Sequence, residues 1–192
     1  DSDSGGTAAT ITSVAGAIAI TGNSTGTETG VEIQSGSVIT STGTGPLAAT
    51  ITIDGTGDED AVYIGNSGSA VNSVDGDIIV SGVAQATGDA KGIWIEDGAT
   101  VSSTGTAGDA ASITLDGRSA MSGTSVEGAG TTITSVAGDI DIIGTGSDVD
   151  GVSLLDAAQV TADSGDITIT GDSTNGTGVL LDAPVTSGDG TV

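Results

Sequence analysis

The residues best suited to chemistry in this chain are clustered carboxylates. Four acids stand within seven residues, in a segment that we expect to be a loop: Asp54, Asp58, Glu59 and Asp60. Hard divalent cations take carboxylate and carbonyl oxygens as ligands, so this segment is a candidate calcium site. Asp139 and Asp166 join it as candidates, because each precedes an equivalent strand of neighbouring repeats and stacked carboxylates repel unless a cation screens them. The alternative is that these acids are solvated turn residues, since neither EF-hand spacing nor a nonapeptide calcium repeat is present.

Catalysis is disfavoured by the residue types that are missing. The chain contains no His and no Cys, and its two basic residues, Lys91 and Arg118, fall in different loops. A lyase needs a base to abstract a proton. A glycosidase needs one defined carboxylate pair, and repetition alone makes many Asp pairs here. We therefore expect a protein that is not an enzyme, and keep a polysaccharide-degrading enzyme as an alternative.

The chain has only two aromatic side chains, Tyr63 and Trp94. Both fall between aliphatic residues that face inward, so both should face outward, at the same position of consecutive repeats. An exposed aromatic pair in a chain so poor in aromatics can mark a contact patch, although single exposed aromatics also occur without function. We predict that Tyr63 and Trp94 form an interaction patch, with a surface or glycan receptor as a possible partner.

The charge of the chain limits its partners. Among 192 residues, 26 are acidic and 2 are basic, which gives a formal net charge of −24. Nucleic acids and anionic membrane surfaces attract basic patches, so this balance predicts binding to neither. No apolar run approaches the roughly 20 residues needed to span a bilayer, so no membrane insertion is expected. No cofactor is indicated apart from possible Ca²⁺.

An internal repeat organises the whole chain. Each unit begins with an aliphatic residue and a short polar residue, at Ile11, Ile39, Val71, Val101, Ile133, Val160 and Val185. The intervals are 28, 32, 30, 32, 27 and 25 residues, with a mean of about 29. A second apolar segment follows at Ile18, Ile51, Ile78, Ile113, Ile140 and Ile167. A third follows at Val31, Val62, Ile93, Thr124, Val152 and Val179, where only Thr124 is not aliphatic.

Period-two alternation within these segments predicts short β-strands. Strands with two inward aliphatics are marginal alone, but stacking of equivalent strands gives each backbone partners and gathers the aliphatics into columns. We therefore predict an all-β fold: one parallel β-helix (β-solenoid) segment over residues 1–192, with three strands per coil and about six coils. Glycines at the corners should supply positive-φ turns. Inward serines at the corner after the first strand should bond each other or the backbone.

The repeat sequence resembles the repeats of large secreted bacterial adhesins of the filamentous-haemagglutinin and autotransporter kind. The segments SGDITITG (164–171) and AGDIDI (137–142) are similar to the strand and corner sequences of those proteins. The resemblance covers nearly the whole chain and implies a right-handed parallel β-helix, exported and displayed at the cell surface as a rod, filament or adhesive stalk. A calcium- or glycan-binding β-helix module is the alternative function.

Both ends of the sequence read as interrupted repeats. Residues 8–13 enter as if from a preceding third strand, and residues 185–192 begin a further coil. An uncovered end of a solenoid exposes unpaired backbone groups. We therefore expect either a longer parent chain or self-association, head to tail, into a filament.

Overall fold

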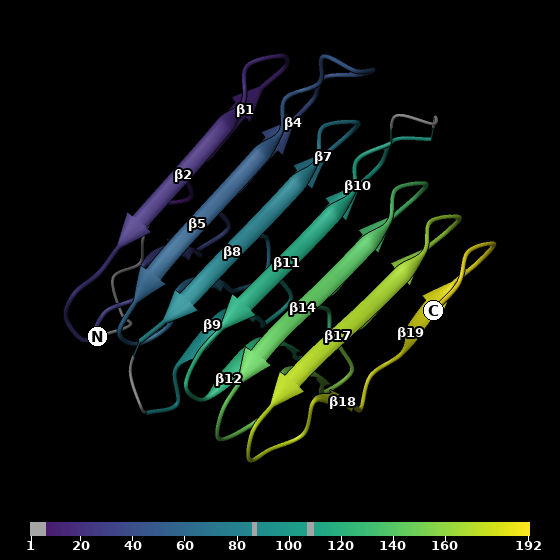
Figure 1. Cartoon of the computed structure of the whole chain (residues 1–192). Helices are drawn as coiled ribbons and strands as arrows, with labels where there is room; N and C mark the ends of the chain where they lie inside the picture. Colours follow the sequence, from purple (N-terminus) through teal and green to yellow (C-terminus); the bar gives the residue numbers. More distant parts are fainter. Residues whose placement is uncertain (1–6, 86–87, 107–109) are drawn as a thin grey trace.

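A computed structural model describes residues 7–85, 88–106 and 110–192. These residues form three parallel sheets and contain no helix. Sheet A consists of β1 (Thr10–Ser13), β4 (Val38–Ser41), β7 (Ala70–Ser73), β10 (Thr100–Ser103), β13 (Thr132–Ser135), β16 (Gln159–Ala162) and β19 (Val185–Ser187). Figure 1 shows the chain winding from sheet to sheet while successive coils lie side by side.

The other two sheets have six strands each. Sheet B consists of β2 (Ile18–Asn23), β5 (Ile51–Gly57), β8 (Ile78–Ala84), β11 (Ile113–Arg118), β14 (Ile140–Gly146) and β17 (Ile167–Ser173). Sheet C consists of β3 (Val31–Ile33), β6 (Val62–Ile64), β9 (Lys91–Ile95), β12 (Ser122–Glu127), β15 (Val152–Leu155) and β18 (Val179–Leu181). The chain is therefore a β-solenoid of about six turns with three strands per coil, as predicted.

The strand register is the one that the repeat predicts. In sheet A, Ile11 pairs with Ile39 and Val101 with Ile133. In sheet B, Ile113 pairs with both Ile78 and Ile140. The segment that leads from sheet A to Ile113 is longer than the equivalent segments before Ile78 and Ile140. Length variation is therefore absorbed outside the strands, and the apolar columns stay in line.

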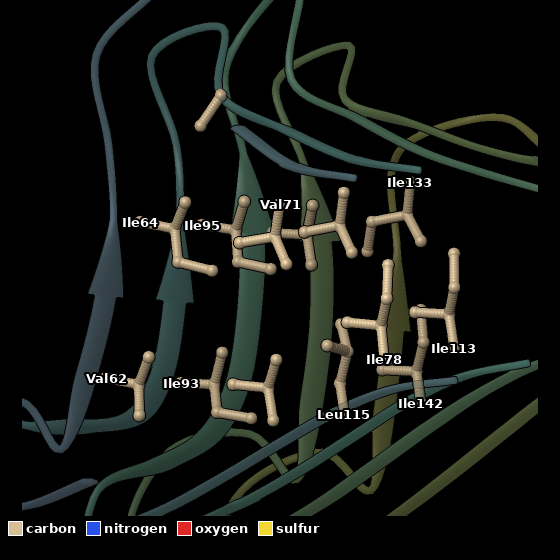
Figure 2. Packing of buried hydrophobic residues seen from close by; sticks show 14 of the residues in the cluster. Val62, Ile64, Val71, Ile78, Ile93, Ile95, Ile113, Leu115, Ile133 and Ile142 are labelled. Atoms are coloured by element: carbon tan, nitrogen blue, oxygen red, sulfur yellow. The ribbon is translucent and has the colours of Figure 1, made fainter. Parts of the chain in front are cut away.

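Those columns make one continuous core. Figure 2 shows Val62 beside Ile93 and Ile64 beside Ile95, with Ile78, Ile113 and Ile142 facing them across the interior. Inward side chains of the middle coils, such as Ile51 and Ile140, have no exposed surface. The end coils are less covered, since Ile11 is 42% exposed and Leu181 is 51% exposed.

The prediction that corner glycines supply positive-φ turns is confirmed at Gly36 and Gly98, but other glycines have a different role. One column of glycines runs through sheet B, for example at Gly117 and Gly144, and these residues pair in register inside the strands. They are not among the residues with positive φ. A Cβ at Gly144 would instead overlap the carbonyl group of Gly151, at the start of the strand on sheet C. This column exists because sheets B and C approach closely, and the approach leaves no space for a side chain.

Left-handed backbone is concentrated at the corner between sheets C and A. Asp97 and Gly98 have φ values of 54° and 81°, and their equivalents Asp156 and Ala157 have values of 52° and 63°. Asp tolerates this region and Gly favours it, whereas Ala is strained there by its Cβ. Ala157 thus occupies a glycine position.

We expect Ala157→Gly to raise the free energy of unfolding by about 1 kcal/mol, because it removes this strain. Denaturant unfolding would measure it. Ala158→Gly is the control: Ala158 is fully buried and is not among the residues with positive φ, so its change should destabilise. A loss of stability with Ala157→Gly would show that Ala157 is not strained at its positive φ.

The serine column at the corner after sheet A gives a second pair of predictions. As expected, the hydroxyl of Ser73 donates a hydrogen bond to the backbone, at the carbonyl of Gly76. The hydroxyl of Ser135, at an equivalent position, is buried without a partner, and Ala162 replaces serine in the next coil. We expect Ser73→Ala to cost about 1 kcal/mol and Ser135→Ala to add about 1 kcal/mol of stability. Equal effects of the two changes in thermal unfolding would be inconsistent with this difference.

Candidate functional site

The turns that lead from sheet B to sheet C line an open groove along one edge of the solenoid. Its volume is about 1060 Å³, and it extends from Thr27 in the first coil to Val149 in the fifth. Carboxylates of Asp58, Glu59 and Asp89 lie along it, together with the aromatic ring of Trp94. The groove therefore brings acidic side chains next to Trp94, one of the two aromatic residues of the chain.

The two aromatic residues lie where the sequence predicts them. Tyr63 of β6 pairs in register with Trp94 of β9, and both side chains are half-buried on the outer face of sheet C. Their ring centroids are 5.2 Å apart and the ring planes are tilted by 60°. This tilted arrangement is favourable for aromatic pairs, so the rings support each other.

Each ring is held by a carboxylate of the following coil. The Tyr63 hydroxyl donates to Oε1 of Glu96 at 3.0 Å, and the Trp94 indole Nε1 donates to Oε1 of Glu127. Burial, with the hydrogen bond to Glu96, raises the pKa of the Tyr63 hydroxyl, which keeps it protonated as a donor. Burial also raises the pKa of Glu96. The aromatic patch is therefore fixed in place rather than freely mobile.

Lys91 covers one face of Trp94. Its ammonium Nζ lies 3.6 Å from the centroid of the Trp94 ring, the geometry of a cation–π contact. Within the described residues the one ion pair joins Arg118 to Asp116 at 3.0 Å, so the Lys91 ammonium has the ring and no paired carboxylate. A positive charge thus lies on the aromatic face of Trp94 within a groove lined by acidic residues.

Asp60 is buried at the base of the turn. Its Oδ1 accepts a hydrogen bond from the backbone N–H of Lys91 at 2.8 Å, and the residue is 6% exposed. Burial raises the pKa of the Asp60 carboxyl, and the N–H and charge of Lys91 only partly offset this. Asp60 therefore fixes the backbone of Lys91, although burial of the negative charge of Asp60 is itself unfavourable.

A raised pKa gives a testable pH dependence. Because folded Asp60 keeps its proton to higher pH than the unfolded chain does, stability falls as pH rises through the folded-state pKa. Asp60→Asn retains the acceptor for the Lys91 N–H and removes the charge. We expect this change to raise the melting temperature at pH 7 and to make stability less dependent on pH above pH 4. Asp163→Asn, an exposed acid in the turn from sheet A to sheet B, is the control.

The fold separates Asp54 from the other three clustered acids. Asp54 lies in β5, not in a loop, and its side chain is exposed on sheet B. Asp58, Glu59 and Asp60 line the groove, and Asp60 is the buried one of the three. In the part of the chain that the structure describes, no group of three or more ligating side chains is arranged to hold a metal ion. Calcium binding at these residues stays a prediction.

Asp139 and Asp166 do stack in adjacent coils, and the structure gives them backbone partners. Oδ1 of Asp139 accepts from the N–H of Asp166 at 2.9 Å. Oδ1 of Asp166 accepts from both the N–H and the hydroxyl of Thr191, at 2.8 and 2.9 Å. These bonds lower the pKa of Asp166. The two carboxylates therefore connect one coil to the next, and calcium binding at them stays a prediction.

Sequence reasoning missed the polar side chains that contact the two aromatic rings. Glu96 and Glu127 become neighbours of the aromatic rings only when the coils stack, whereas Lys91 lies in the same strand as Trp94. The spacing could have predicted the two carboxylate contacts, because each aromatic donor precedes its acceptor by 33 residues, close to one repeat.

No helix long and apolar enough to cross a membrane occurs in the described residues. No family model matches the sequence, and no curated protein or solved structure shows significant similarity to it.

Proposed function

We propose that the chain is a rod segment of an adhesive protein displayed on the outside of the cell. The observation that carries this proposal is the unbroken parallel stacking of all three sheets from the first coil to the last. A solenoid held by contacts between neighbouring coils grows in length with each repeat and needs no other core. The seven strands of sheet A extend about 30 Å at the usual strand spacing.

The sequence of the repeats and the surface charge of the chain support the adhesive and extracellular parts of the proposal. The segments 137–142 and 164–171, which resemble secreted adhesins, form the corner and strand of successive coils in sheet B. A net charge of −24 keeps such a rod soluble and prevents lateral association. Labelling of intact producing cells with an antibody against this chain tests display: surface signal is expected, and signal only after lysis would overturn it.

Self-association can follow from the two ends. β1, β2 and β3 lie at one end of their sheets, and β17, β18 and β19 lie at the other. All strands of a sheet run in the same direction, so pairing of one end of a copy with the opposite end of another continues the parallel stack, a heterologous contact that produces filaments. We expect light scattering to show mass that grows with concentration. Leu181→Lys, which places a charge on a 51% exposed end residue, should abolish this growth.

Glycan binding is the second candidate, and the groove favours it. Ligand sites combine a concave surface with apolar contacts and polar groups that fix orientation, and the groove offers both, with Trp94, Met121 and Val149 among acidic and polar residues. Adhesion needs a surface that recognises a receptor, which the groove can provide while the coils provide length.

A further inference from the structure

The groove carries an unequal charge. Asp58, Glu59, Asp60 and Asp89 line it, Asp60 with little exposed surface, while Lys91 is its one basic residue. Such a surface attracts cationic groups and repels anionic ones, and the net charge of −24 adds to the same field. Sugars that bear carboxylate or sulfate groups are therefore poor ligands for it.

The face of Trp94 shows which chemical group the groove can hold. An ammonium already stands on that face, since Nζ of Lys91 lies 3.6 Å from the ring centroid. Among the described residues no carboxylate forms an ion pair with this ammonium. It is held by a flexible side chain on an aromatic surface, so the ammonium of a ligand can take its place by the same cation–π attraction.

The shape of the groove indicates a chain-like ligand. It crosses the turns of five coils, which is about 19 Å at the usual strand spacing. Its walls combine small apolar surfaces, at Met121 and Val149, with hydrogen-bonding groups such as Gln85. Pyranose rings, which have apolar faces and polar edges, suit these walls. A peptide would find no free strand edge here, because the strands beside the groove pair along the stack.

We propose that this groove binds an oligosaccharide with free amino groups, and that one of its ammonium groups displaces Lys91 from the face of Trp94. The inference rests on the adhesive part of the proposed function and names its receptor class. It does not depend on the assembly of the ends.

Trp94 is the only tryptophan in the chain, so its fluorescence reports on this site alone. Titration with glucosamine oligomers should change the emission and saturate. Glu59→Gln and Asp89→Asn should each weaken binding by about twofold to fivefold, as expected for partly screened charges. Lys91→Met should strengthen binding, because it removes the competing cation. Asp163→Asn, with an exposed side chain in a turn between sheets A and B, is the matched control and should leave the affinity unchanged.

Four results would overturn the proposal. Equal affinity for N-acetylated oligomers of the same length would show that the amino group is not recognised. Equal affinity for spermine would reduce the groove to a site for small cations, and tighter binding of oligolysine would make its ligand a protein. Weakening by Asp163→Asn to the same degree as by Glu59→Gln would show non-specific attraction. Titration of the Leu181→Lys variant, which should not assemble, separates a failure of binding from a failure of filament formation.

Discussion

Ile113→Ala is expected to lower the free energy of unfolding by about 2–5 kcal/mol, the usual cost of a cavity left by a large buried aliphatic residue. Ile113 has no exposed surface and sits in the middle of the column of sheet B, paired with Ile78 on one side and Ile140 on the other. A solenoid is held by contacts between neighbouring coils, so a cavity here weakens the contact of both halves of the rod. Urea unfolding followed by circular dichroism would measure the loss.

Ile79→Ala provides the matched control. Ile79 belongs to β8 of the same sheet and follows directly on Ile78, but its side chain faces outward and is 36% exposed. Removal of its methyl groups opens no internal cavity, and we expect a change of at most about 1 kcal/mol. Comparable losses for Ile79→Ala and Ile113→Ala would mean that the alternation has been assigned to the wrong faces.

The alternation is the part of the fold that could be predicted most completely from the sequence. Ile51 and Ile53 face inward because their spacing matches the two-residue period of a strand, and the same pair recurs at each repeat. The ends of the strands were less predictable. Asp54 lies inside β5 because pairing with β2 and β8 continues to residues beyond the aliphatic pair, where the side chains carry no apolar signal.

The groove could be predicted only in part, for a related reason. The common column of Tyr63 and Trp94 follows from the repeat, and it is confirmed by their pairing. The position of Lys91 on the Trp94 ring depends on the path of the preceding turn and on a side-chain rotamer, neither of which repeats along the chain. Burial of Asp60 beside exposed Glu59 depends on the same turn.

Gly144→Ala should be at least as damaging as many core substitutions, although it adds only one methyl group. An added Cβ would overlap the carbonyl of Gly151, which is backbone and cannot rotate away, and would also contact the side chain of Val152. The overlap can be relieved only by moving sheet B away from sheet C, which opens the core on both sides of the glycine. We expect a loss of about 3 kcal/mol or more, at the upper end of overpacking effects. Thermal unfolding with paired near- and far-ultraviolet circular dichroism would detect it.

Gly26→Ala separates this effect from the general cost of replacing glycine. Gly26 lies in a turn from sheet B to sheet C, and a Cβ there would meet no atom within 4 Å. Its φ lies outside the positive range, so alanine fits its backbone as well as its surroundings. The change should be within about 0.5 kcal/mol of neutral. If Gly144→Ala were equally mild, the close approach of sheets B and C would not be what requires glycine in this column, and the tight cross-section of the solenoid would have to be explained by side-chain packing alone.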